Sequence, residues 1–377
     1  MPARWRHQRA LSSGSSHVEN GTGRLPCLRL LKRSSSAAAT TSPSTTRAAA
    51  GSWNTAFRPS TRTSTPPVRF RSAGALPGSA SGEPGRERAV GVEAGVGVVM
   101  ATRDRAADVL STLRRLDALP GQPPVVVVDN ASSDGTAEQV AEAFRDVRVE
   151  RLPANLGAAA RSVGAAVLET PLVAFSDDDS WWAPGALALA GRRFAEDEGL
   201  GLLAATVLVG REERPDPVNQ AMAQSPLAEE RPAGPGVPVL GFLACGAVVR
   251  RRAFLDVGGF EHRYGVGGEE ELLALDLVRA GWRVEHHPDV VAHHHPSGGS
   301  RDPEARRRRQ VRNALLTALL RHRWPDLARR AGALAAGTPP RTFVGGLRDL
   351  APDVGWALSC RQPLPPDLQE RVRLLGG

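Results

Sequence analysis

The sequence of 377 residues has few cysteines and no long apolar segment. Its three cysteines, Cys27, Cys245 and Cys360, are far apart and form no CxxC pair. This spacing argues against a zinc ribbon or a disulfide framework and favours a reducing compartment, the cytoplasm. No stretch approaches about 18 uninterrupted apolar residues, so we expect no membrane-spanning helix. Neither a GxxxxGK[ST] motif nor a GxGxxG motif after the first apolar run is present, which argues against P-loop and dinucleotide-binding proteins.

Lysine is almost absent, and the positive charge is unevenly distributed along the chain. Only Lys32 is a lysine, and we interpret the preference for arginine as a compositional bias. Residues 1–82 contain twelve of the 48 basic residues and one acid, Glu19. This segment therefore carries a net charge of +11, whereas the remainder carries −3. A near-neutral remainder argues against a groove for nucleic acid.

The first 92 residues are rich in Ser, Thr, Ala, Arg, Pro and Gly and have no persistent apolar period. Such a composition predicts a disordered tail, as in an organelle transit peptide or a dispensable or misassigned extension. Met100 offers a later start, but a chain beginning there would lose its first strand. We therefore predict a tail over 1–92, a folded domain over 93–325 and a C-terminal helical extension over 326–377.

From about residue 95, apolar runs typical of buried strands alternate with segments of helical period. This alternation predicts an α/β fold with a mostly parallel sheet flanked by helices. In such sheets ligands bind at the carboxyl ends of the strands. We expect strands at 96–102, 123–130, 147–153 and 172–179, and helices at 106–119, 132–144, 155–169 and 182–194.

Three consecutive aspartates, Asp177–Asp179, stand at the carboxyl end of the fourth expected strand. Adjacent carboxylates repel each other, and a divalent cation that prefers oxygen ligands, Mg²⁺ or Mn²⁺, would neutralise them. The alternative is a solvated acidic turn or cap before the next helix. The DxDx[TV] pattern of one phosphatase class is not met, because its fifth position is Trp181.

Four motifs in order resemble the family 2 glycosyltransferases, which have the GT-A fold. They are VVVVDNASSDGT, NLGAAARSVGAA, AFSDDDSWW and GGFEHRYGVGGEEELLALDLVRAGWRV, and the resemblance covers residues 95–315. It implies an inverting enzyme with Mg²⁺ or Mn²⁺ that moves a sugar from a nucleoside-diphosphate sugar, such as a UDP- or dTDP-sugar, to an acceptor hydroxyl. The implied acceptor is a glycan or a lipid-linked sugar in cell-surface polysaccharide or glycolipid synthesis, at the inner face of the membrane.

The resemblance assigns nucleotide contacts to the ends of the first strands. Thr102 and Arg103 lie where the family contacts the nucleoside, and Asp129 matches the acid that binds uracil or ribose. The alternative for Asp129 is a turn-forming role within DNASSDG. Asn155 and Gly157 match a turn whose amide and close backbone meet the nucleotide.

The same resemblance assigns roles around the aspartates. Arg161 would reach a phosphate, with a solvated helix face as the alternative. Asp177 would contact ribose or the metal, and Asp179 would bind the metal that bridges the two phosphates. Asp178 is expected to point away, because neighbours in an extended segment face opposite sides.

A base and a further ligand are expected in the second half of the chain. Aligning GGF and AGW without gaps places Glu270 where the family has its catalytic Asp, with Glu269 as the alternative base. The resemblance also implies a histidine ligand after the following strand. We choose His293, with His294 and His295 as alternatives because the register cannot be derived from the sequence.

The remaining segments carry weaker signals. Residues 211–238 are polar and proline-rich and predict a long loop, and the arginine-rich start of 305–320 predicts a solvated helix end or an attraction to phosphate or anionic membranes. A sugar nucleotidyltransferase is disfavoured because MATRDR lacks a GxGTR loop. A non-catalytic sugar-nucleotide-binding protein is a second alternative, since Glu270 replaces the family's Asp.

Overall fold

Seven longer strands build the central sheet of the described part of the chain, and six of them run in the same direction. The computed structural model describes residues 95–231, 234–297 and 302–376, so the tail predicted for 1–92 lies outside the described residues. The strands follow the order β3-β2-β1-β4-β9-β6-β10-β5. Their bounds are β1 (Val96–Thr102), β2 (Val125–Asp129), β3 (Arg148–Arg151), β4 (Leu172–Asp177), β6 (Leu200–Val209), β9 (Ala247–Arg250) and β10 (Arg283–His294).

The prediction of a mostly parallel sheet is confirmed. Strands β1 to β4 pair in parallel, as do β6 and β10, and β9 runs antiparallel between β4 and β6. Because β9 is antiparallel to both neighbours, β6 points the same way as β4. Three short strands pair antiparallel with the longer ones: β5 (Ser180–Trp182) and β8 (Val237–Pro238) with β10, and β7 (Arg214–Pro215) with β6.

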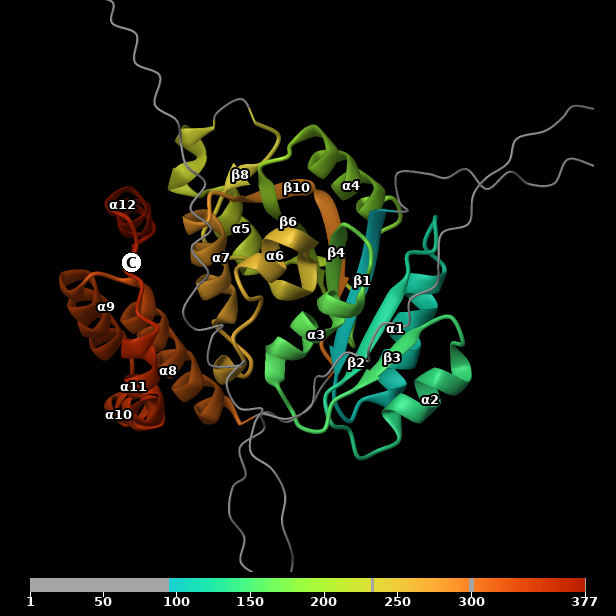
Figure 1. Cartoon of the computed structure of the whole chain (residues 1–377), viewed down its shortest axis with the longest axis horizontal. Coiled ribbons are helices and arrows are strands. Elements are labelled where there is room, and N and C mark those ends of the chain that lie inside the picture. Colours follow the sequence, from blue (N-terminus) through green and yellow to red (C-terminus); the bar gives the residue numbers. More distant parts are fainter. Residues whose placement is uncertain (1–94, 232–233, 298–301, 377) are drawn as a thin grey trace, which may run out of the picture. The chain divides into compact units, whose positions relative to one another are not determined.

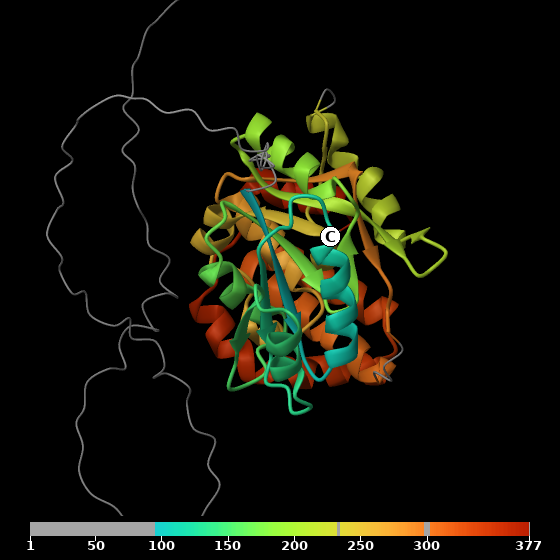
Figure 2. The ribbon, with the colours of Figure 1, turned by 90° about the vertical axis from the view of Figure 1, so that its right-hand side faces the viewer.

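Two buried apolar clusters, one on each face, hold the helices on the sheet. Alternate side chains of a strand point to opposite faces, so Val98 and Met100 join one cluster and Val99 the other. Figure 2 shows α1 in front of the sheet and the C-terminal helices behind it. The first cluster contains residues of α1 (Ala106–Asp117), α2 (Thr136–Ala143) and α4 (Ala186–Glu196). The second contains residues of α3 (Ala160–Val167), α6 (Arg251–Asp256) and α7 (Glu269–Arg279).

The prediction of a long loop over 211–238 is wrong for much of that range. Helix α5 (Pro217–Ala223) begins after Asp216, whose side chain accepts a hydrogen bond from the backbone N–H of Val218. A 3₁₀ helix, η4 (Pro226–Glu230), follows in the same way after Ser225. Proline in the first turn and a capping residue before it are helix-start signals, so these prolines begin helices here.

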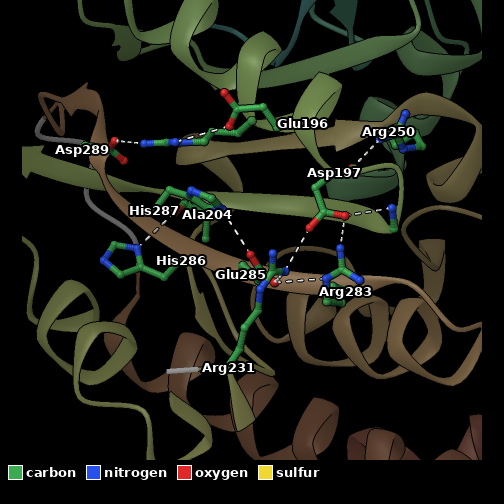
Figure 3. Close-up of polar contacts among 12 residues, drawn as sticks. Glu196, Asp197, Ala204, Arg231, Arg250, Arg283, Glu285, His286, His287 and Asp289 are labelled. Carbon is green, nitrogen blue, oxygen red and sulfur yellow. Dashed lines mark hydrogen bonds and ion pairs between the residues drawn. The ribbon is translucent and has the colours of Figure 1, made fainter. Parts of the chain in front are cut away.

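A polar network anchors the start of β10 to the segment before β8 (Figure 3). One guanidinium nitrogen of Arg231 lies 2.9 Å from Asp197 and 2.6 Å from Glu285. Arg283 pairs with both of these carboxylates. Burial alone would raise the pKa of Glu285, but the hydrogen bond from His287 and the charge of Arg231 outweigh burial and lower it. The network therefore depends on an ionised Glu285.

Glu285→Gln is expected to lower the free energy of unfolding by about 2–3 kcal/mol, because it removes a buried charge that two arginines contact. Urea denaturation at neutral pH would measure the loss. Glu196→Gln is the matched control, since its exposed pair with Arg193 is worth at most about 1 kcal/mol. An equal effect of the two substitutions would contradict a structural role for Glu285.

Five α-helices of the described residues 302–376 gather at the left of Figure 1, and α8 and α9 among them contact α7. They are α8 (Pro303–Arg321), α9 (Trp324–Gly337), α10 (Pro340–Leu350), α11 (Val354–Ser359) and α12 (Pro366–Leu374). Ion pairs join them to α7: Asp276 binds Arg321 of α8, and Glu271 binds Arg330 of α9 at 2.9 Å. Within the described residues, no helix combines the length and the apolar character needed to cross a bilayer.

Candidate active site

The carboxyl ends of β1, β2 and β4 bring three predicted site residues to one edge of the sheet. Thr102 pairs with Asp129 in the register of β1 and β2. Asp177 pairs with Ala101, the residue before Thr102, in the register of β1 and β4. The predicted site residues at these strand ends are thus neighbours, as expected for a ligand site in a parallel sheet.

Asp178 is turned toward β1 and α1. Its carboxylate accepts a hydrogen bond from Thr102 Oγ1 at 2.9 Å and lies 3.0 Å from Arg105 Nε. Its backbone carbonyl accepts a bond from Thr112 Oγ1 at 2.7 Å. Burial raises the pKa of Asp178 to about 7, although Arg105 and Thr102 oppose the rise. Asp178 therefore joins the aspartate turn to the helix that follows β1.

Asp179 accepts contacts on both carboxylate oxygens. Oδ2 accepts hydrogen bonds from Arg105 Nη2 at 3.0 Å and from the backbone N–H and Oγ of Ser297 at 3.2 and 3.1 Å. Oδ1 lies 3.3 Å from His294 Nε2. Burial alone would raise the pKa of Asp179, but these donors, His294 first, lower it to about 2. The group is therefore ionised at neutral pH.

Asp177 forms an ion pair with Arg161, a buried arginine of α3. Its carboxylate keeps 31% of its surface exposed, whereas the Arg161 side chain keeps 9%. The charges of Asp177, Glu269 and Glu270 all raise the pKa of Arg161 against the effect of burial. The sequence predicts that Arg161 reaches a phosphate, and the structure places its guanidinium among these carboxylates.

Asp177, Asp179 and His294 form a candidate cation site. Each offers one ligand atom, and these three atoms lie within 4.8 Å of one another. Two carboxylates and one imidazole match the ligand preferences of Mn²⁺, and the carboxylates match those of Mg²⁺. Arg105 and Arg161 compensate part of the negative charge here. The residues present therefore fit a divalent cation.

The structure brings His294, rather than the predicted His293, to the aspartates. His293 Nδ1 lies 3.3 Å from Glu213, and its ring stacks on Trp181 with 5.5 Å between ring centroids. Neighbouring residues of a strand point to opposite sides, so only one of the two histidines can face Asp179. A register shift of β10 between His287 and Val291 separates this part of the strand from its beginning.

The residues predicted to contact the nucleoside lie on a pair of linked turns. Asp129 Oδ1 accepts a hydrogen bond from the backbone N–H of Ser132 at 3.2 Å, which is the turn-forming contact expected within DNASSDG. Asn130 joins this turn to the next one: its amide donates to the carbonyl of Gly157 at 3.0 Å and accepts from the N–H of Leu156 at 2.7 Å. Asn130 thus fixes the two turns relative to each other.

Gly157 is required by its surroundings. It has a φ of +60°, and a Cβ atom at this position would lie 2.3 Å from the carbonyl oxygen of Gly265. Asn155 Oδ1 accepts a hydrogen bond from the N–H of Gly157 at 2.8 Å and shapes the turn. Arg103, by contrast, lies at the surface and pairs with Asp104 at 3.4 Å. The structure does not bring Arg103 to the aspartates.

Glu269 and Glu270 begin α7 on the Arg161 side of the aspartates. Burial, followed by the charge of Glu270, raises the pKa of Glu269 to about 7. Burial also raises the pKa of Glu270, with Asp177 adding to the rise and Arg161 opposing it. Glu269 is buried and Glu270 is half-buried. A carboxylate with a raised pKa that a ligand can reach is suited to act as a general base.

Glu271 has a different environment from the two preceding glutamates. It accepts hydrogen bonds from Arg330 at 2.9 and 3.0 Å and so anchors α7 to α9. Successive residues of a helix are about 100° apart around its axis, which explains why Glu271 faces the C-terminal helices. Its contacts are those of a structural residue.

No role in the site was predicted from the sequence for three residues of this region: Arg105, Asn130 and Ser297. Arg105 pairs with both Asp178 and Asp179, and Ser297 binds Asp179 across a long separation in the chain. Asn130 directly follows Asp129, so its place after a strand was a usable signal. For Arg105 and Ser297 no local pattern exists, because their partners are distant in sequence.

Comparison with known proteins identifies the domain that contains these strand ends. Residues 97–258 match the sequence profile of glycosyl transferase family 2. The pre-mycofactocin glycosyltransferase of Mycobacterium tuberculosis is 33% identical over 207 residues, which cover 53% of this chain and 43% of that protein. The N-acetylglucosaminyl-diphospho-decaprenol L-rhamnosyltransferase of the same organism is 28% identical over 212 residues, covering 48% and 69%. The chain thus spans less than half of the first relative.

Similar solved structures include a mannosyltransferase from Pyrobaculum calidifontis in complex with GDP-Man and Mn²⁺. It has a TM-score of 0.47 and 25% identity, over 71% of this chain and 72% of that one. GalNAc-T7 with UDP, GalNAc and Mn²⁺ has a TM-score of 0.49 and 13% identity, over 72% and 58%. The segment 97–258 thus matches glycosyl transferase family 2, and the curated relatives and the observed sheet agree with that match.

Proposed function

We propose that this protein is an inverting, metal-dependent glycosyltransferase that moves a sugar from a nucleoside-diphosphate sugar to an acceptor hydroxyl. One observation supports this proposal most: Asp177, Asp179 and His294 form a cation-binding arrangement at the carboxyl edge of the sheet. Arg161 pairs with Asp177 and is also influenced by the charges of Glu269 and Glu270, whose pKa values burial raises. The proposed catalytic unit is the segment 93–325, with 326–377 as a helical extension.

The proposed chemistry uses one general base. Glu270 takes the proton from the acceptor hydroxyl while that oxygen attacks the anomeric carbon from the face opposite the leaving group. Burial raises its pKa above the ordinary value, and a carboxylate with a raised pKa takes up a proton more readily. When bound, a divalent cation would supply Lewis-acid neutralisation of the departing diphosphate. Arg161 holds Asp177 in place through their ion pair.

The donor and the acceptor are proposed by class. A UDP- or dTDP-sugar is the donor class that the family resemblance implies, with the nucleoside next to Thr102, Asp129 and Asn155. A glycan or lipid-linked sugar in cell-surface polysaccharide or glycolipid synthesis is the proposed acceptor. The name of one curated relative, a rhamnosyltransferase for N-acetylglucosaminyl-diphospho-decaprenol, supports the lipid-linked choice.

A panel of nucleotide sugars tests the proposal. The full chain is incubated with each donor and Mn²⁺, with and without lipid-linked acceptors, and the release of nucleoside diphosphate is measured. We expect one donor to be turned over, and we expect chelation of the metal to stop the reaction. Donor binding without turnover in the whole panel would favour a non-catalytic binding protein instead.

A further inference from the structure

Two adjoining cavities lie on the α1 side of the aspartate turn, away from Glu270. Their volumes are about 390 and 480 Å³, and Arg115, Trp181, Arg211 and His295 line both of them. Helix α1 packs on one face of the sheet, whereas α3 and α7, which carry Arg161 and Glu270, pack on the other. The proposed transfer chemistry makes no use of these four residues.

The part that the two cavities share is positively charged. The Arg115 guanidinium lies 3.9 Å from the centroid of the Trp181 ring, and both residues line the two cavities. His293 stacks on the same ring and pairs with Glu213, the one carboxylate in the lining of the second cavity. In the part of the chain that the structure describes, no carboxylate forms an ion pair with Arg115 or Arg211. Two arginines thus line both cavities without an ion-paired carboxylate.

The first cavity also has acidic and hydroxyl residues in its lining. Asp108, Ser111, Asp178 and Asp179 line it. All three carboxylates lie 3.0 to 3.2 Å from the Arg105 side chain, which compensates part of their charge. Carboxylate and hydroxyl oxygens can accept hydrogen bonds from the hydroxyl groups of a ligand. The lining of the first cavity therefore offers both hydrogen-bond acceptors and cationic donors.

We propose that this cavity binds a sugar that carries a phosphate monoester. The phosphate contacts Arg115 and Arg211, whose planar forks match phosphate oxygens in pairs. The sugar hydroxyls donate to Asp108 and Ser111. A cavity of about 390 Å³ suits a ligand of this size. Asp179 lies between this cavity and the candidate cation site, but the proposed phosphate contacts, Arg115 and Arg211, take no part in the transfer chemistry. The inference does not depend on transfer activity.

Calorimetric titration of the full chain with glucose 1-phosphate tests the site. We expect binding with and without Mn²⁺, and no binding of glucose under the same conditions. Arg115→Gln and Arg211→Gln are each expected to weaken binding about tenfold, because each removes a charge-assisted contact to phosphate. Both arginines are exposed, so the variants should fold, which thermal melting would verify.

Arg114→Gln is the matched control. Arg114 is also an exposed arginine of α1, but it does not line either cavity. We expect this variant to bind glucose 1-phosphate as the unchanged protein does. Equal weakening by Arg114→Gln, a requirement for Mn²⁺, displacement of glucose 1-phosphate by UDP, or the absence of binding would each overturn the proposal.

Discussion

Glu270→Gln is expected to lower the turnover of sugar transfer by about 10²-fold or more, with little change in donor affinity. The substitution keeps the size of the side chain but removes its ability to accept the acceptor proton, and general-base catalysis is typically worth about 10²- to 10⁴-fold. Donor affinity should persist because Glu270 lies on α7, apart from the strand ends that carry Thr102 and Asp129. Turnover at saturating acceptor and donor affinity by calorimetry would be measured together.

Two neighbouring variants make this test specific. Glu271→Gln should change turnover only mildly, because Glu271 binds Arg330 of α9. Glu269→Gln distinguishes the alternative base, since Glu269 has a pKa of about 7 and lies beside Arg161. If Glu269→Gln alone abolished turnover, the base would be Glu269. If none of the three variants lost activity, the base would lie elsewhere.

The raised pKa of Glu270 also predicts a pH profile. A general base acts in its ionised form, so turnover should increase as the pH rises through the pKa of this group. Burial raises that pKa above the ordinary value of 4.5, which should move the acidic limb of the profile upward by the same amount. Glu269 and Glu270 influence each other, so the limb reports on the pair. Glu270→Gln should remove or shift this limb.

Asp179→Ala is expected to abolish transfer and to remove the dependence of donor binding on Mn²⁺ or Mg²⁺. Asp179 is ionised and contributes one of the three ligand atoms of the candidate cation site, so its loss leaves too few ligands for a stable site. Donor binding would be titrated calorimetrically at several metal concentrations. Thermal melting would check the fold, because Asp179 also binds Arg105 and Ser297.

A pair of histidine variants provides the matched control for the metal. His294→Ala should weaken the metal dependence, because His294 Nε2 lies beside Asp179. His293→Ala should leave it nearly unchanged, because His293 faces Glu213 and Trp181. Turnover by Asp179→Ala that still depends on metal would refute the cation site. A larger effect of His293→Ala than of His294→Ala would favour His293 as the ligand.

The amino-acid sequence by itself determined the α/β layers and the edge of the sheet where the aspartates lie. Valine-rich runs such as 125–128 are buried on both faces, which is a local pattern that sequence periodicity reports directly. Strands of one direction end at the same edge, so the sequence pattern is enough to group Thr102, Asp129 and Asp177. The helix that begins with the three glutamates was likewise predicted from the helical period of its apolar residues.

Only the tertiary structure decided which side chains meet at that edge. The choice of His294 over His293 depends on the pairing of β10 with β5, and a shift of one residue would reverse it. The contact of Arg105 with Asp178 and Asp179 joins residues more than 70 positions apart. Such contacts form because separate strands end side by side in space. The residues next to each partner in the sequence therefore do not indicate which distant residue it will contact.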